Sequence, residues 1–149
     1  MKTSILKYLF LLFLFQVTLF SSSALANEYK NISIKFLEYK NINKTIINQE
    51  ILKVKDIKVA YLFNLSDNGY ILVPINKTAS PIKAYSFSSN FKNLPSKYRN
   101  FLLNQLYNIS MDKTLLRSVD SSISNRWSFL ENFRKSDKRV LYTPDTYLL

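Results

Sequence analysis

The single glycine of the chain lies between two apolar runs, and it constrains the fold more than any other residue. Gly69 follows Asp67 and Asn68, and all three residue types accept the positive φ angles of a tight turn. Residues 70–73 after the turn are apolar. Before the turn, four residues alternate at period two: Val59, Tyr61, Phe63 and Leu65. The pattern predicts a β-hairpin over residues 58–73.

A third strand is expected at Ala84-Tyr85-Ser86. Pro74 cannot donate to a ladder, so it should end the second strand or lie at an edge. Residues 76–81 have the polar composition of a turn. The three strands together predict a small antiparallel β-meander.

Two amphipathic helices are predicted after these strands. Pro95 suits the first turn of the earlier helix, and Asn93 or Ser96 could cap it; Ser110 or Asp112 could start the later one. Both helices can cover one face of the sheet, and we expect both stripes, Trp127 included, to be core. The stripes are Tyr98, Phe101, Leu102, Gln105, Leu106 and Ile109 in the first helix, and Leu116, Val119, Ile123, Trp127 and Leu130 in the second.

The segment before the hairpin has a weaker pattern. Ile32, Phe36 and Tyr39 share one face of a helix, which we favour, although alternation at Ile32, Ile34 and Phe36 would also suit a strand. Residues 46–47 and 51–52 are expected to be connecting extended segments. The expected fold class is therefore α+β, with the meander packed against two or three α-helices.

Residues 1–26 have the three parts of a secretory leader. Lys2 and Lys7 precede an apolar run that extends to Phe20, and residues 24–26 read Ala-Leu-Ala. An uncleaved anchor is the alternative, but the strongly apolar part is shorter than the roughly 20 residues that span a bilayer. We expect cleavage after Ala26, a secreted or periplasmic protein, and no stable membrane insertion afterwards.

Residues 27–149 have the length of a single domain, with residues 135–149 as a strand-like C-terminal tail. The chain contains no cysteine and no histidine. These absences exclude a Cys/His dyad, a Ser-His-Asp triad and any thiolate or imidazole metal site. The carboxylates form no acid pair or metal loop, so we expect no enzyme, no cofactor and no metal.

The formal net charge is +11, of which Lys2 and Lys7 of the leader contribute two. The remaining basic residues are scattered, without a nucleic-acid-binding motif, so we expect no nucleic-acid partner. The excess reflects either a biased composition or an acidic protein partner, for which charge would raise the association rate.

Five segments between residues 60 and 109 follow one another in a familiar order: Tyr61–Asn64, Gly69–Val73, Ser80–Ile82, Ala84–Ser86 and Phe91. Together they resemble the propeptide of streptopain-type cysteine peptidases, a domain that also occurs as the free-standing Spi-type inhibitor. The chain departs from the family pattern at Pro74-Ile75-Asn76, where a small residue and Gly-Asp are usual. It also has Ser89 where glycine is common.

The resemblance implies a domain that docks on such a peptidase and occludes its active-site cleft non-covalently, without being cut. We expect a monomer when free. Two alternatives stay open: a non-enzymatic basic envelope or adhesion module, and the remnant propeptide of a truncated peptidase precursor.

The candidate partner-binding residues lie in and before the loop Ser88–Lys97. This loop is polar, and it offers two apolar residues, Phe91 and Leu94, as anchors for a protease subsite. The alternative for Phe91 is burial under the sheet. The candidate residues are Tyr85, Ser86, Ser89, Asn90, Phe91, Asn93 and Leu94.

Overall fold

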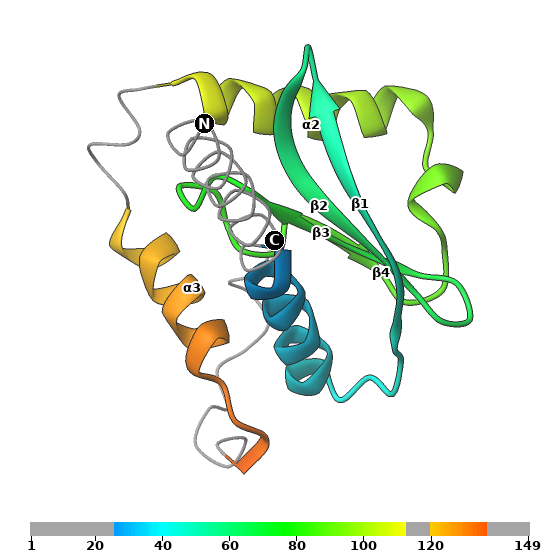
Figure 1. The fold of residues 1–149 in the computed structure, drawn as a ribbon, viewed down its shortest axis with the longest axis vertical. Coiled ribbons are helices and arrows are strands. Elements are labelled where there is room, and N and C mark those ends of the chain that lie inside the picture. Colours follow the sequence, from blue (N-terminus) through cyan, green and yellow to red (C-terminus); the bar gives the residue numbers. More distant parts are fainter. Residues whose placement is uncertain (1–25, 113–119, 137–149) are drawn as a thin grey trace, which may run out of the picture. The chain divides into compact units, whose positions relative to one another are not determined.

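The computed structural model describes residues 26–112 and 120–136 (Figure 1). The predicted leader up to residue 25, the tail from residue 137, and Leu116 and Val119 of the second stripe lie outside the described residues. Contacts divide the chain into residues 1–30 and 31–149. The second unit contains β1 (Ile46–Val54), β2 (Ile57–Leu65), β3 (Tyr70–Pro74), β4 (Ala84–Ser86), α2 (Ser96–Met111) and α3 (Ser121–Asn132).

The four strands form one antiparallel sheet in the order β1-β2-β3-β4, so the α+β class is confirmed. The predicted meander corresponds to β2, β3 and β4, and β3 ends at Pro74 as expected. The prediction of separate connecting segments before it was wrong, because residues 46–54 form one nine-residue edge strand. Its polar residues, such as Asn48 and Lys53, obscured the strand pattern, since an edge strand buries only part of its side chains.

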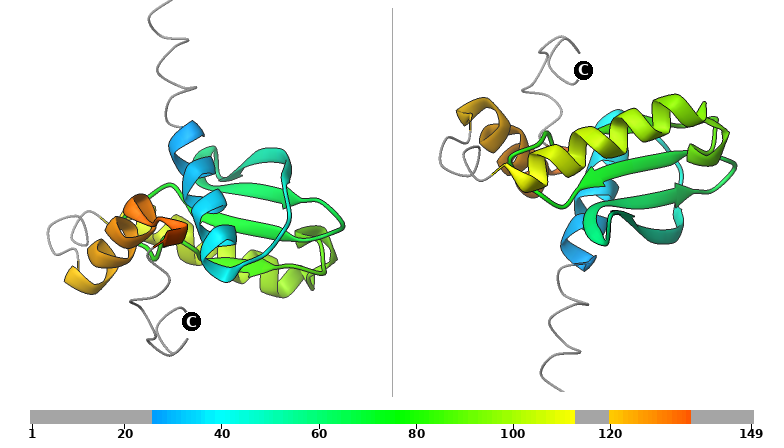
Figure 2. Two further views of the ribbon diagram at one scale, coloured as in Figure 1. Left: turned by 90° about the horizontal axis from the view of Figure 1, so that it is seen from below. Right: turned by 90° about the horizontal axis from the view of Figure 1, so that it is seen from above.

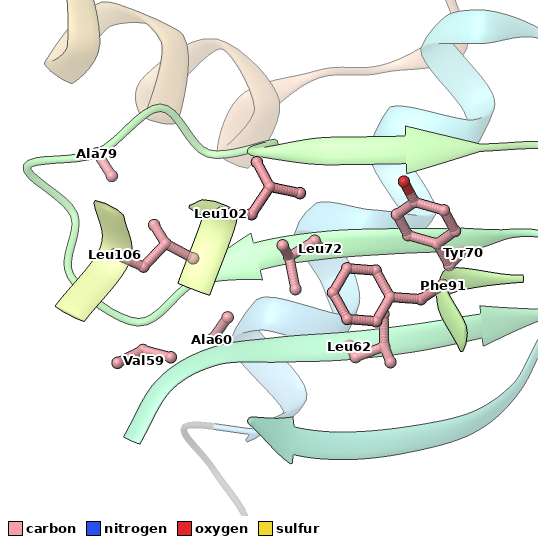
Figure 3. Close-up of a cluster of buried hydrophobic side chains, with 9 residues drawn as sticks. All are labelled: Val59, Ala60, Leu62, Tyr70, Leu72, Ala79, Phe91, Leu102 and Leu106. Atoms are coloured by element: carbon pink, nitrogen blue, oxygen red, sulfur yellow. The ribbon is translucent and has the colours of Figure 1, made fainter. Parts of the chain in front are cut away.

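The two central strands are covered by helices on both faces (Figure 2). On one face, α2 packs Leu102 and Leu106 against Leu62 and Leu72 (Figure 3). On the other face, Phe36 meets Tyr85 edge-to-face, with 5.0 Å between the ring centroids. This double cover explains why β2 and β3 are buried almost throughout.

A helix over residues 26–40 precedes the sheet, which confirms the favoured interpretation of that segment. Ile32 and Phe36 on its predicted face are 1% and 0% exposed. The helix ends because Asn41 adopts a left-handed φ of 57°. The Asn41 and Ile42 amides then donate to the Glu38 and Leu37 carbonyl oxygens, which is a Schellman motif.

The predicted stripe of α2 was only partly right. Leu102 and Leu106 are buried, whereas Tyr98 and Phe101 are 47% and 55% exposed. Ile109 of the predicted stripe packs against the same core, and so do Leu103 and Tyr107, which the stripe did not include. Pro95 occupies the N-cap position, and no side chain caps the helix.

Helix α3 does not share the sheet face with α2, contrary to the prediction. Its buried Trp127 donates an indole hydrogen bond of 2.8 Å to the Ala79 carbonyl oxygen in the loop before β4. The helix begins at Ser121, and Asp120 caps it by accepting a 2.9 Å hydrogen bond from the Ser122 amide. Within residues 26–112 and 120–136, no helix is long and apolar enough to cross a membrane.

Candidate functional site

Two of the seven predicted partner-binding residues belong to the core. Phe91 is 5% exposed, and its ring lies edge-to-face on Tyr70 with 5.2 Å between centroids. Leu94 is half-buried against the same cluster. An anchor residue must be exposed to enter a partner's pocket, so these two side chains stabilise the domain in this conformation instead of presenting an apolar anchor.

Three more of the predicted residues hold the loop in place. The Asn90 side chain donates a 3.0 Å hydrogen bond to Asn68 Oδ1 and accepts one of 3.4 Å from the Gly69 amide. Ser86 Oγ accepts a 3.1 Å hydrogen bond from the Ser89 amide. The Asn90 contacts tie the loop to the turn between β2 and β3, and the Ser86 contact ties the start of the loop to the end of β4.

The remaining two predicted residues are exposed but belong to different elements. Tyr85 is 36% exposed on β4, where its ring contacts Phe36 and Phe87. Asn93 is exposed at the end of the short helical turn Phe91–Asn93. The seven residues therefore do not converge on one concave site.

A groove of about 640 Å³ lies between β4, α2 and α3. Its volume is in the range of small-molecule and peptide pockets. The loop end and β4 contribute Lys83 and Ala84, while α3 contributes Arg126. Tyr70 lies at the base, and in Figure 3 its hydroxyl points toward the side of β4. The wall from α2 includes Tyr98, Phe101 and Gln105.

The polar groups of this groove are mostly hydrogen-bond donors or cations. Burial lowers the pKa of Lys83, because desolvation disfavours the ammonium form. Burial raises the pKa of the Tyr70 phenol, and Tyr98 raises it further. No carboxylate lines the groove. Its electrostatic character therefore suits a negatively charged ligand.

A second groove, of about 600 Å³, lies between α3 and residues 75–78. The Lys77 ammonium lies 2.9 Å from Glu131 Oε1 and 5.3 Å from the Trp127 ring centroid. Lys77 and Glu131 form an ion pair between residues 75–78 and α3. This groove is therefore a packing contact that holds α3 to that loop.

Sequence reasoning did not identify the first groove. Phe101 and Leu102 follow Tyr98 at spacings of three and four residues, which match a helical stripe, so the pattern predicted that both aromatic side chains lie in the core. Lys83 and Arg126 lie 43 positions apart in sequence, and no local motif links them. Among residues 26–112 and 120–136, no three acidic side chains gather closely enough to hold a metal ion.

Comparisons with known proteins give one curated relative. The chain is 29% identical over 112 residues to a protein named "Uncharacterized metalloprotease" from Buchnera aphidicola subsp. Baizongia pistaciae. The match covers 75% of this chain but 30% of the relative, so the chain spans about a third of that protein's length. No protein-family model matches the chain, and no solved structure is significantly similar to it.

Proposed function

We propose that the chain is a non-catalytic domain that binds a peptidase and occludes its active-site cleft. The observation that carries the proposal is the 112-residue similarity to a protein named as a metalloprotease, in a chain that contains no histidine or cysteine. Zinc peptidases generally hold their metal through histidine. The shared region in this chain therefore suits an accessory role beside a peptidase.

Two target classes follow from two separate observations. The Buchnera relative favours a metalloprotease as the target. The resemblance of residues 60–109 to streptopain propeptides favours a streptopain-type cysteine peptidase. Both give the same physical role, because a small domain can cover a cleft with a standard interface of about 800 Å² per partner.

A binding assay with both enzyme classes tests the proposal. The metalloprotease arm uses the Buchnera relative without its matched region, and the cysteine peptidase arm uses a streptopain-type enzyme. We expect calorimetry to give a dissociation constant of about 1 µM or tighter for one of them. Cleavage of a fluorogenic substrate by that enzyme should fall to background at one equivalent of this chain.

Binding to neither enzyme at about ten times that concentration would overturn the proposal and favour the basic envelope or adhesion module. A chain that is itself cut at stoichiometric ratio would contradict the inhibitor role and favour the remnant of a precursor. Both outcomes are read by mass spectrometry and calorimetry on the same samples.

The predicted loop can be tested in the same assay. Replacing its exposed residues, Lys92→Ala with Asn93→Ala, should weaken binding about tenfold if the loop contacts the enzyme. Asn104→Ala on the exposed side of α2 is the matched control. Equal affinities of both variants and wild type would place the contact elsewhere on the domain.

We also propose that the protein is exported and begins at Asn27 after leader removal. Intact-mass measurement on protein recovered outside the cytoplasm of a bacterial host should give the mass of residues 27–149. A mass that retains the leader, found in the membrane fraction, would instead indicate an anchored protein.

A further inference from the structure

The β4 edge of the sheet is open to strand addition. β4 has three residues and pairs with β3 on one side, and within the described residues no strand pairs with its other side. Such an edge leaves backbone N–H and C=O groups available to an incoming extended chain. The groove described above is lined by Lys83, Ala84 and Tyr85 at this edge, so a bound segment would reach both the backbone and the groove.

Two cations face this groove without a local carboxylate among its lining residues. The Lys83 ammonium is engaged by no ion pair or side-chain hydrogen bond within residues 26–112 and 120–136, and burial lowers its pKa. Arg126 influences the Asp120 carboxyl, whose pKa is lowered chiefly by the Ser122 amide, but Asp120 does not line the groove. A half-buried ammonium without a counter-ion gains from a ligand that supplies one.

Two large apolar side chains lie exposed on the wall of the same groove. Tyr98 and Phe101 are 47% and 55% exposed, and they project from one side of α2 at a spacing of three residues. Exposed aromatic side chains beside polar groups are typical of binding surfaces, because they supply contact area at low conformational cost. They suit an apolar side chain that alternates with a charged one along an extended ligand.

We propose that this groove binds an extended acidic segment of a partner protein, which pairs with β4 as a fifth strand. One carboxylate of the segment lies between Lys83 and Arg126, and a neighbouring apolar side chain packs on Phe101. Charge complementarity selects this occupant, since the groove holds cations and donors and no acid. Two cations form too short a basic track for a nucleic-acid backbone. The proposal is independent of the peptidase-binding function.

Selection from a randomised eight-residue peptide library displayed on phage tests the proposal with the full chain as bait. We expect enrichment of sequences that place Asp or Glu next to an apolar residue. The best peptide, labelled with a fluorophore, is then titrated against the protein by fluorescence anisotropy. Replacing its acidic residue by the corresponding amide should weaken binding about tenfold, because the charge-assisted hydrogen bonds are lost.

Protein variants separate the groove from the general positive charge of the molecule. Lys83→Gln with Arg126→Gln should weaken the peptide about tenfold or more, and Phe101→Ala should weaken it several-fold. Lys97→Gln is the matched control, because Lys97 is an exposed α2 residue outside the groove. It should stay within about twofold of wild type. Circular dichroism melts establish that each variant is folded.

Peptide backbone methylation tests the strand pairing itself. A peptide methylated on alternate amide nitrogens cannot donate to β4, so its affinity should fall about tenfold when the methylated edge faces the strand. Unchanged affinity for both alternating patterns would overturn strand addition. The proposal also fails if selection enriches no acidic sequences, or if Lys97→Gln weakens binding as much as the double variant. A synthetic peptide of this chain's own residues 137–149 is titrated beside the selected peptides. If it binds and no selected peptide does, the groove does not bind an acidic segment of a partner.

Discussion

The two turns that flank β2 both connect antiparallel strands through residues with positive φ angles, but they use different residue types. The β1–β2 turn is a two-residue connection in which Lys55 and Asp56 have φ angles of 47° and 64°. The β2–β3 turn uses Asp67, Asn68 and Gly69, with φ angles of 52°, 60° and 132°. Both match the twist of an antiparallel hairpin through positive φ, but only the second contains glycine.

The difference lies in what surrounds each turn. The Lys44 ammonium donates to the carbonyl oxygens of Ser66, Asp67 and Asn68 at 2.8, 2.9 and 2.9 Å. Asn90, which follows the turn in sequence as Lys44 precedes it, forms hydrogen bonds with the same turn. In the β1–β2 turn, Lys55 and Asp56 are exposed, and the Lys55 ammonium lies 5.4 Å from the Tyr107 ring centroid. A turn whose backbone is hydrogen-bonded by distant residues tolerates little change, whereas the β1–β2 turn depends more on its own backbone preferences.

The largest expected effect is at Gly69. In Gly69→Val, the new Cβ would lie 2.8 Å from the Ser86 carbonyl oxygen, at a φ of 132° that β-branched residues avoid. Strain and clash together should destabilise the fold by about 3 kcal/mol. Urea unfolding measures this loss, with Asp67→Gly as the control that keeps the turn. An unchanged midpoint for Gly69→Val would show that the turn is not constrained as described.

The second effect concerns the lysine that holds this turn. Lys44→Met keeps the aliphatic stem but removes three charge-assisted hydrogen bonds to backbone carbonyls. We expect a loss of about 1.5 kcal/mol in the free energy of unfolding, reduced from the sum of three bonds because the site is partly exposed. Lys97→Met, at an exposed position, should be neutral. Equal stability of Lys44→Met and Lys97→Met would show that the Lys44 hydrogen bonds do not stabilise the turn.

The third effect tests the contact from the other side. Asn90→Ala removes the hydrogen bonds to Asn68 and Gly69, and it should cost about 1 kcal/mol. Asn93→Ala, three residues later and exposed, should leave the thermal midpoint unchanged. If both variants melt together with wild type, Asn90 does not tie the loop to the turn.

The smallest effect has the opposite sign and concerns the exposed turn. Asp56→Gly relieves a left-handed non-glycine residue at the second turn position, where glycine is preferred. The gain is offset in part by the extra entropy of glycine in the unfolded chain, so about 0.5 kcal/mol of stabilisation is expected. Asp56→Ala should destabilise slightly. A loss of stability in Asp56→Gly would mean that the Asp56 side chain holds this turn.

The same contrast explains which elements could be predicted from the sequence. The Gly69 hairpin, the third strand and the positions of α2 and α3 carry strong local patterns, and each was predicted, although the buried side of α2 was only partly right. β1 was missed because its turn has no glycine and its residues alternate imperfectly, with register shifts beside Ile46 and Leu52. Its strand character depends on pairing with β2, which lies outside any local window.

By itself, the sequence determined where a positive φ angle needs glycine and which catalytic or metal-binding side chains are absent. Gly69 alone accepts a φ of 132° against a neighbouring carbonyl, and the lack of histidine and cysteine excludes Cys/His dyads, Ser-His-Asp triads and imidazole or thiolate metal sites. Tertiary structure alone decided which apolar residues face the core and which remain exposed. It buried Phe91 on Tyr70 and left Phe101 beside Lys83 and Arg126, because burial depends on which elements meet in space, and helical periodicity records only that a stripe exists.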